Sequence, residues 1–168
     1  MNYKIALVGM MGCGKTTVAK ILADKFNVPL FDCDLIFEEK YKIKIVDYFN
    51  QFGEEKFRNC ENIILNEIIK NDNFIISCGG GVVLNKANRE ILFSDSIKTF
   101  YLKTKAETIF ERIKYDTTRP LLLVENPLEK INELILNREK FYKMANYSIL
   151  TDCKTVDDVA LEIINNYG

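Results

Sequence analysis

The strongest constraint on the fold is a glycine-rich segment between a short apolar strand pattern and a helical pattern. Residues 9–16 are Gly-Met-Met-Gly-Cys-Gly-Lys-Thr, preceded by an apolar run at residues 4–8 and followed by apolar side chains at helical spacing in residues 15–25. The segment fits the pattern G-x-x-x-x-G-K-[ST] in its required context of strand, loop and helix. It predicts a parallel sheet with the loop at its carboxyl edge.

This loop is built to bind the phosphates of a nucleoside triphosphate. Its glycines let the backbone curl, so that N–H groups converge on phosphate oxygens at a positive helix N-terminus. Lys15 would reach the β- and γ-phosphates, and the hydroxyl of Thr16 would ligate Mg²⁺. GTPases, ATPase motors and small-metabolite kinases share this motif. The guanine-specific pattern N-K-x-D is absent, because its relative at residues 85–88 ends in Asn88.

Apolar runs and helical patterns alternate along the rest of the chain, which indicates an α/β fold with a mainly parallel sheet. We predict strands at residues 4–8, 29–33, 74–78, 97–102 and 147–150. We predict helices at residues 15–25, 54–70, 86–93, 105–114, 127–145 and 156–165. Asn126 before Pro127, and Thr155, are expected to begin two of these helices. No repeat or linker divides the chain, so we expect one domain spanning residues 1–168.

The composition excludes several classes of function. The chain has no histidine, which excludes histidine bases and histidine-ligated metals. Because 23 basic residues balance 24 acidic residues, we expect no binding to nucleic acid or to a membrane. The five cysteines have no C-x-x-C spacing, and no apolar run approaches the roughly 20 residues of a membrane span. We therefore expect a cytoplasmic protein, and we expect a monomer.

A pair of carboxylates, Asp32 and Asp34, follows the second predicted strand. In an extended chain both would point to the same side, at the edge of the sheet where α/β proteins bind ligands. One could hold the hydration shell of Mg²⁺, and the other could accept a proton from an acceptor hydroxyl. The alternative is a solvated pair that caps the next helix.

Two arginines and a glycine run also suggest a ligand. Arg138 lies in an apolar stripe of the predicted helix 127–145, where it needs an anionic ligand or an internal salt bridge. Arg58 could bind an anion or form a surface ion pair with Glu61, three residues along the helix. The glycines at residues 79–81 favour close approach of a ligand or of another chain segment.

Residues 115–125 show neither a helical nor a strand period and contain Pro120. We interpret them as a mobile loop. The alternative is a fixed connection with a buried leucine patch at residues 121–123.

Together these features resemble the shikimate kinase family, in order and over nearly the whole chain. The matching motifs are GMMGCGKTT, DCD, F-G-E-x-x-F-R-x-x-E, GGG, RPLL at residues 119–122 and R-x-x-x-Y from Arg138 to Tyr142. The resemblance implies an α/β, three-layer P-loop kinase fold like that of the nucleoside monophosphate kinases, with a five-stranded parallel sheet in the order 2-3-1-4-5. It also implies a lid at about residues 115–125 and an acceptor-binding region at about residues 33–61.

The resemblance implies ATP-dependent phosphorylation of the shikimate 3-hydroxyl, giving shikimate 3-phosphate and ADP in the pathway to chorismate and the aromatic amino acids. It implies Lys15, Asp34 and Arg119 as catalytic residues. Thr16 and Asp32 would hold Mg²⁺. The residues implied to bind ATP are Gly12, Cys13, Gly14, Lys15, Thr16, Thr17, Arg112 and Arg119. The residues implied to bind shikimate are Asp34, Arg58, Gly80 and Arg138.

Two other classes of protein stay open at this point. A gluconate or nucleoside kinase shares the phosphate-binding loop, but it has no evident need for Arg58 and Arg138 beside a glycine run. A catalytically idle nucleotide-binding regulator would be expected to lack Asp34 or Arg119, and both are present.

Overall fold

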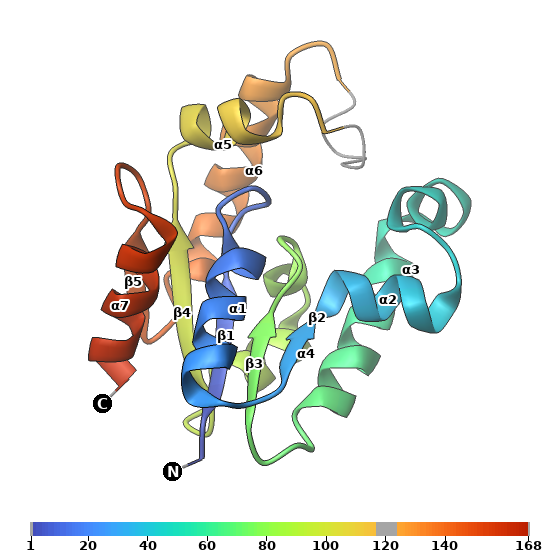
Figure 1. Ribbon diagram of the computed structural model, residues 1–168. Coiled ribbons are helices and arrows are strands. Elements are labelled where there is room, and N and C mark those ends of the chain that lie inside the picture. The colour runs from blue at the N-terminus through green and yellow to red at the C-terminus, as the bar shows by residue number, and fades with distance from the viewer. Residues whose placement is uncertain (1, 117–123, 168) are drawn as a thin grey trace.

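A computed structural model describes residues 2–116 and 124–167 and shows a parallel sheet between two layers of helices (Figure 1). The strands are β1 (Lys4–Val8), β2 (Leu30–Asp32), β3 (Phe74–Ser77), β4 (Lys98–Lys103) and β5 (Tyr147–Leu150). They lie in the order β2-β3-β1-β4-β5, and every neighbouring pair is parallel. The predicted α/β class and strand order are confirmed.

Helices cover both faces of the sheet, so alternate residues of each strand are buried on opposite sides. The helices are α1 (Lys15–Phe26), α2 (Cys33–Tyr41), α3 (Ile45–Ile68), α4 (Lys86–Leu92), α5 (Ala106–Ile113), α6 (Pro127–Tyr142) and α7 (Val156–Tyr167), with a 3-10 turn η1 (Val82–Leu84). Ile5 and Leu7 of β1 pack with side chains of α1 and α7. Ala6 and Val8 pack with side chains of α3, α4, α5 and α6.

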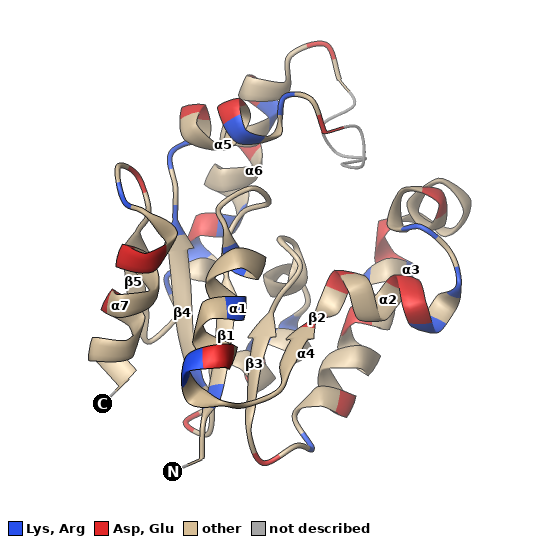
Figure 2. Cartoon of the chain, viewed as in Figure 1, with Lys and Arg blue, Asp and Glu red and all other residues tan. Residues whose placement is uncertain are grey.

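This two-sided burial explains why the strands are nearly continuous in apolarity. The side chains of Phe74, Ile75 and Ile76 in β3 are fully buried. Charged residues lie mostly on the helices and loops around the sheet (Figure 2). The carboxyl ends of the strands are therefore the part of the sheet where polar groups can gather.

The sequence predictions missed α2 and the first part of α3. The chain leaves the extended conformation directly after Asp32, so the expectation that residues 32–34 stay extended is wrong. The Asp32 Oδ1 atom accepts the N–H groups of Asp34 at 3.1 Å and Leu35 at 3.3 Å, which caps α2. α3 begins at Ile45 rather than at residue 54, and Gly53 kinks it with a φ of 81°.

Two predicted helix starts are confirmed by their capping bonds. The side chain of Asn126 accepts the N–H of Glu129 at 3.3 Å, directly before Pro127. The Thr155 hydroxyl accepts the N–H of Asp158 at 3.1 Å, and the Asp158 carboxylate accepts the N–H of Thr155 at 2.9 Å. This reciprocal pair fixes the entry of the chain into α7.

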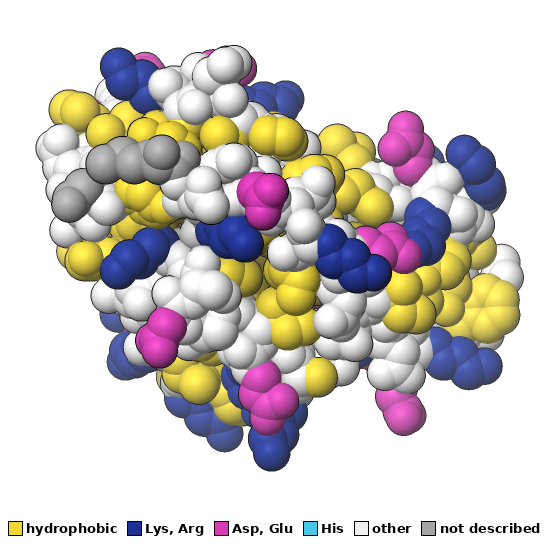
Figure 3. Space-filling view, turned by 90° about the horizontal axis from the view of Figure 1, so that it is seen from below, with side chains coloured by type: hydrophobic (Ala, Val, Ile, Leu, Met, Phe, Trp, Pro, Cys, Tyr) yellow, Lys and Arg dark blue, Asp and Glu magenta, His cyan; other side chains and the backbone are white. Residues whose placement is uncertain are grey.

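Within residues 2–116 and 124–167, we find no helix that combines the length and the apolarity needed to cross a bilayer. On the face drawn in Figure 3, basic and acidic side chains are interspersed among apolar ones rather than gathered by sign. The predicted mobile loop falls largely on residues 117–123, which lie outside the described residues, so it stays a prediction.

Candidate active site

Two cavities adjoin at the carboxyl edge of the sheet. The first has a volume of about 440 Å³ and lies among the phosphate-binding loop, Arg112 and the start of α7. The second has a volume of about 320 Å³ and lies among the ends of β2 and β3 and side chains of α2, α3 and α6. The residues that line both are Met11, Thr16, Asp34 and Gly80. A ligand in one cavity would therefore lie next to a ligand in the other.

The phosphate-binding loop needs glycine for two separate reasons. Gly9 and Gly12 have φ values of 147° and 74°, which side chains disfavour. A Cβ atom on Gly9 would also lie 2.7 Å from the Leu102 carbonyl oxygen, and one on Gly12 would lie 2.7 Å from Ile113 Cγ2. α1 then begins without a side-chain cap, and its first turn lines the first cavity. A helix N-terminus arranged in this way favours an anion.

Lys15 places its ammonium group inside this loop. Its Nζ atom donates to the carbonyl oxygens of Gly9 and Met10, both at 2.9 Å, and lies 3.6 Å from the Cys13 Sγ atom. The side chain is buried. A positive charge is thus held within the loop that would receive the phosphates.

Oxygen atoms gather beside the loop at the ends of β2 and β3. The Thr16 hydroxyl donates to Asp32 Oδ2 at 2.7 Å and lies 3.2 Å from the Ser77 hydroxyl. The other oxygen of Asp32 caps α2, so this carboxylate both caps a helix and faces the loop. Hydroxyl and carboxylate oxygens are the ligands that Mg²⁺ prefers, and the donor set therefore fits this ion.

The second cavity contains a buried ion pair. The guanidinium of Arg58 bonds Glu61 Oε2 at 2.7 Å and Glu54 Oε1 at 2.8 Å. The pairing of Arg58 with Glu61 is as the helical spacing suggested, but the pair is buried: Arg58 is 9% exposed and Glu61 is 4% exposed. It is therefore not the surface ion pair that was the alternative interpretation.

Glu61 carries an unusual carboxylate. Its Oε1 atom is buried and has no hydrogen-bond partner among the described residues. Burial raises the pKa of Glu61 to about 7, although the neighbouring charge of Arg58 opposes that shift. In the sequence, Glu61 stands out only as a helical neighbour of Arg58. Its place in the wall of the second cavity is a finding of the structure.

Arg138 is almost completely buried and lines the same cavity. Among residues 2–116 and 124–167, no carboxylate lies within 4.0 Å of its guanidinium, and its Nη1 atom lies 4.0 Å from Met10 Sδ. An internal salt bridge within this part of the chain therefore does not account for Arg138. A buried guanidinium in such a place favours an anionic ligand.

The glycine run after β3 makes room for these charged side chains. A Cβ atom on Gly81 would lie 2.1 Å from Arg58 Nη2, and one on Gly79 would lie 2.6 Å from Glu61 Oε1. Close approach of another chain segment, one of the two predicted reasons for the run, is confirmed. Gly80 lies at the boundary between the two cavities.

An apolar wall, which was not predicted from the sequence, completes the second cavity. Its members are Ile45, Phe49 and Phe57. The rings of Phe49 and Phe57 lie with their centroids 4.8 Å apart. Ile45 and Phe49 belong to the part of α3 that was not predicted, so their amphipathic spacing was the only available signal.

The structure brings the predicted site residues together as two sets. The predicted ATP-binding residues that line the first cavity are Gly12, Cys13, Gly14, Lys15, Thr16, Thr17 and Arg112. The predicted shikimate-binding residues that line the second are Asp34, Arg58, Gly80 and Arg138. Lys154 and Thr155 also line the first cavity. Arg119 lies outside the described residues, so its role stays a prediction.

Comparison with known proteins decides the family. The shikimate kinase family model matches residues 11–167. The chain belongs to the shikimate kinase family. The shikimate kinase of Thermodesulfovibrio yellowstonii is 40% identical over 163 residues, which cover 97% of this chain and 94% of that protein. The shikimate kinase of Thermoanaerobacter pseudethanolicus is 37% identical over 97% of this chain and 95% of its own length.

Solved structures agree with this assignment. The shikimate kinase of Acinetobacter baumannii, in complex with shikimate, has a TM-score of 0.94 and 35% identity, covering 98% of this chain and 93% of that one. A gluconokinase from Sinorhizobium meliloti has a TM-score of 0.62 and 14% identity, which shows a shared fold alone. The chain is a small-molecule kinase with ATP as its phosphoryl donor.

Proposed function

We propose that this kinase transfers the γ-phosphoryl group of ATP to the 3-hydroxyl of shikimate, giving shikimate 3-phosphate and ADP. The observation that carries the proposal is the pair of adjoining cavities, one formed by a phosphate-binding loop and the other containing two buried arginines. They meet at Thr16, Asp34 and Gly80, which is where a donor phosphate and an acceptor hydroxyl have to meet.

The second cavity suits a small cyclic acid that carries hydroxyl groups. Arg138, which has no carboxylate partner in the described part of the chain, and Arg58 would bind the carboxylate of shikimate through their planar guanidinium groups. Phe49 and Phe57 would pack against the carbon ring. Gly80 would contact the hydroxyl side of the ligand, next to the phosphate-binding loop.

Transfer would follow from placement and charge. Asp34 would orient the attacking hydroxyl and accept its proton. A bond forms between that hydroxyl oxygen and the γ-phosphorus as the bond from phosphorus to the leaving oxygen of ADP breaks, roughly in line. Lys15 would neutralise charge on the β- and γ-phosphate oxygens, and Arg119 would add a second positive charge.

Thr16 and Asp32 are the residues that would hold Mg²⁺, with the Ser77 hydroxyl supporting Thr16 from β3. When bound, this ion supplies further neutralisation of phosphate charge. The chain itself contributes the placement of these oxygens, since the capping bonds from Asp32 to the start of α2 fix the carboxylate.

We also propose that residues 1–168 form one catalytic unit, a monomer that acts in the cytoplasm. The two cavities draw on residues from Met11 to Val159 of a single chain, so neither half of the sequence contains a complete site. The acceptor-binding region would be residues 33–61, and the lid would be about residues 115–125. The five cysteines are free, which suits a reducing compartment.

A coupled assay of ADP release tests the proposed reaction. We expect ADP formation with shikimate and only background rates with gluconate or nucleoside monophosphates. The product is identified by ³¹P and ¹H NMR, which should show a phosphate ester at the 3-hydroxyl. Turnover of gluconate at the rate of shikimate, or a phosphate on another hydroxyl, would contradict the assignment.

A further inference from the structure

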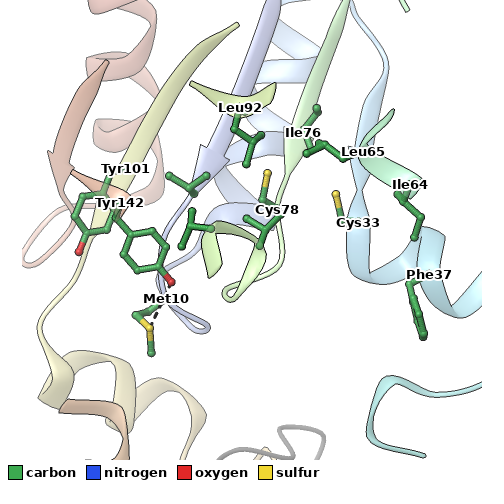
Figure 4. Close-up of a cluster of buried hydrophobic side chains, with 14 of the residues drawn as sticks. Met10, Cys33, Phe37, Ile64, Leu65, Ile76, Cys78, Leu92, Tyr101 and Tyr142 are labelled. Atoms are coloured by element: carbon green, nitrogen blue, oxygen red, sulfur yellow. Dashed lines mark hydrogen bonds between the residues drawn. The ribbon is translucent and has the colours of Figure 1, made fainter. Parts of the chain in front are cut away.

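The last residue of α6, Tyr142, contacts Gly80, one of the residues that line both cavities. It is fully buried, and its ring stacks on Tyr101 of β4 with the centroids 4.9 Å apart. Its hydroxyl donates to the carbonyl oxygen of Gly80 and lies 3.6 Å from the Met10 Sδ atom. Figure 4 shows the Tyr142 hydroxyl directed toward Met10, with Tyr101 beside the ring. One phenol group thus touches the glycine run and the phosphate-binding loop together.

Met10 is contacted twice by the same helix. Arg138 and Tyr142 are four residues apart on α6, so their side chains lie on one face. The Nη1 atom of Arg138 lies 4.0 Å from Met10 Sδ, next to the contact made by the Tyr142 hydroxyl. Met10 itself is 2% exposed. The proposed carboxylate-binding arginine is therefore packed against a side chain of the phosphate-binding loop.

Gly80 lies close to the phosphate-binding loop and to Arg138. A Cβ atom placed on it would lie 3.2 Å from the backbone nitrogen of Met11 and 3.6 Å from Arg138 Nη1. The Tyr142 hydroxyl donates a hydrogen bond to its carbonyl oxygen. A shift of Gly80 would thus change the boundary shared by the two cavities.

Packing alone does not explain the hydroxyl group at this position. A phenylalanine would fill the same space and stack equally on Tyr101, whereas a buried hydroxyl is costly unless it is hydrogen-bonded. The bond to Gly80 satisfies this requirement and at the same time fixes a residue of the boundary. A fixed spacing between donor and acceptor is what a phosphoryl transfer needs most.

We propose that Tyr142 and Met10 are positioning residues that hold Gly80 and Arg138 at a fixed distance from the phosphate-binding loop. This inference rests on the proposed function and deepens it. Neither side chain needs to touch a substrate. Tyr142 acts through the Gly80 carbonyl, and Met10 acts as the surface against which Arg138 and Tyr142 pack.

The variant Tyr142→Phe tests the role of the hydroxyl, with Tyr101→Phe as the matched control in the same aromatic stack. We expect Tyr142→Phe to raise the KM for shikimate about tenfold and to lower kcat severalfold, because loss of one fixed contact misplaces the acceptor. The Kd of a nonhydrolysable ATP analogue should stay within twofold. Tyr101→Phe should change each of these values by less than twofold.

A second variant separates positioning from stability. Met10→Leu keeps the volume of the side chain but removes the sulfur contacted by Tyr142 and Arg138. Like Tyr142→Phe, it should raise the KM for shikimate. Because the Tyr142 hydroxyl contacts the Met10 sulfur, the effects of the two changes on the KM should be less than additive in the double variant. Thermal unfolding of each variant identifies any that fails to fold, and Met10→Leu then decides the question.

The outcomes distinguish this inference from the proposed function. Wild-type protein that releases no ADP with shikimate overturns the proposed function, and the inference with it. If the wild-type protein is active but neither Tyr142→Phe nor Met10→Leu changes the KM for shikimate, the inference alone is overturned. If Tyr142→Phe and Tyr101→Phe change the KM for shikimate and kcat equally, the Tyr142 hydroxyl has no special role. That result would also overturn the inference.

Discussion

The two cavities are built in opposite ways. The longest continuous part of the first is residues 11–18, whose glycines allow the backbone to approach a phosphate closely. The second is formed by side chains from α2, α3, the glycine run and α6. The first depends on the conformation of one loop, and the second depends on charged side chains brought together from separate elements.

This difference implies that the two cavities respond differently to mutation. The phosphate-binding loop should be damaged by adding an atom, as well as by removing its lysine. The acceptor cavity should be damaged chiefly by removing charge, because its buried side chains supply the proposed contacts to the ligand.

The largest effect is expected on removing the positive charge inside the loop. Lys15→Ala should lower kcat by at least about a hundredfold, because Lys15 would neutralise charge that grows on phosphate oxygens during transfer. Steady-state kinetics with saturating shikimate measure it. Lys20→Ala, on the exposed side of α1, is the control and should leave kcat unchanged. Near-normal turnover by folded Lys15→Ala would contradict the assignment of the loop.

Removal of the buried guanidinium should affect the acceptor cavity alone. Arg138→Ala should weaken shikimate binding by about 2 kcal/mol, or roughly thirtyfold, because the carboxylate loses a charged partner. Binding of ATP without shikimate should be nearly unchanged. Titration calorimetry measures both affinities, with Lys140→Ala on the exposed face of α6 as the control. An unchanged affinity for shikimate together with lower thermal stability would indicate a purely structural arginine.

Adding one methyl group to the loop should weaken the nucleotide site. Gly12→Ala places a Cβ atom 2.7 Å from Ile113 Cγ2 at a φ of 74°, so the loop has to shift. We expect the Kd of ATP to rise roughly tenfold, since such strain costs about 1–3 kcal/mol. Gly53→Ala is a control with the same kind of backbone strain, because it has a φ of 81° and open space around it. That variant should lose stability but keep its affinity for ATP.

The smallest effect concerns protonation in the acceptor cavity. The folded protein raises the pKa of Glu61 from 4.5 to about 7, mainly through burial, with Asp34 adding to the shift and Arg58 and Arg138 opposing it. The folded state therefore binds this proton more tightly than the unfolded state does. The contribution of Glu61 to the free energy of unfolding is fully present below about pH 4.5 and is lost as the pH rises through about 7.

Glu61→Gln should remove this dependence on pH. We expect its unfolding temperature to fall less than that of the wild type between pH 5 and pH 8, by a few degrees. The positive charge of Arg58 opposes protonation of Glu61, and a ligand carboxylate at Arg58 would offset that charge. The pKa of Glu61 should then rise further, so that shikimate binding near pH 7 is accompanied by proton uptake. Calorimetry in buffers of different ionisation enthalpy measures this uptake. If the unfolding temperature changes with pH by the same amount in the wild type and in Glu61→Gln, another group is responsible for the pH dependence.

The sequence predicted the nucleotide side better than the acceptor side for a physical reason. The glycines, Lys15 and Thr16 are adjacent in the chain, so their spacing alone indicates what they bind. All five strands were placed within one or two residues, because burial on both faces leaves continuous apolar runs. The carboxyl-edge location of the loop followed from the same pattern.

The acceptor side depends on contacts that no local pattern records. The sequence provided Arg58 and Arg138 as oddly placed charges, but not the burial of Glu61 or the packing of Tyr142 on Met10. The start of α2 was missed because the capping preference of Asp32 competed with an extended strand pattern, and the capping bonds prevailed. Gly53 interrupts the helical period of α3, and the first two turns of this helix were therefore not predicted.

The segment between β2 and β3 has a consequence for changing specificity. Residues 33–68 supply Ile45, Phe49, Phe57 and Arg58 to the second cavity as one continuous insertion. The flanking strands are fixed to each other by the pairing of Leu30 with Ile75 and of Asp32 with Ser77. A foreign helical insertion that keeps Asp34 and has the same end-to-end span could thus be grafted onto these strands, presenting a different alcohol to an unaltered phosphoryl donor.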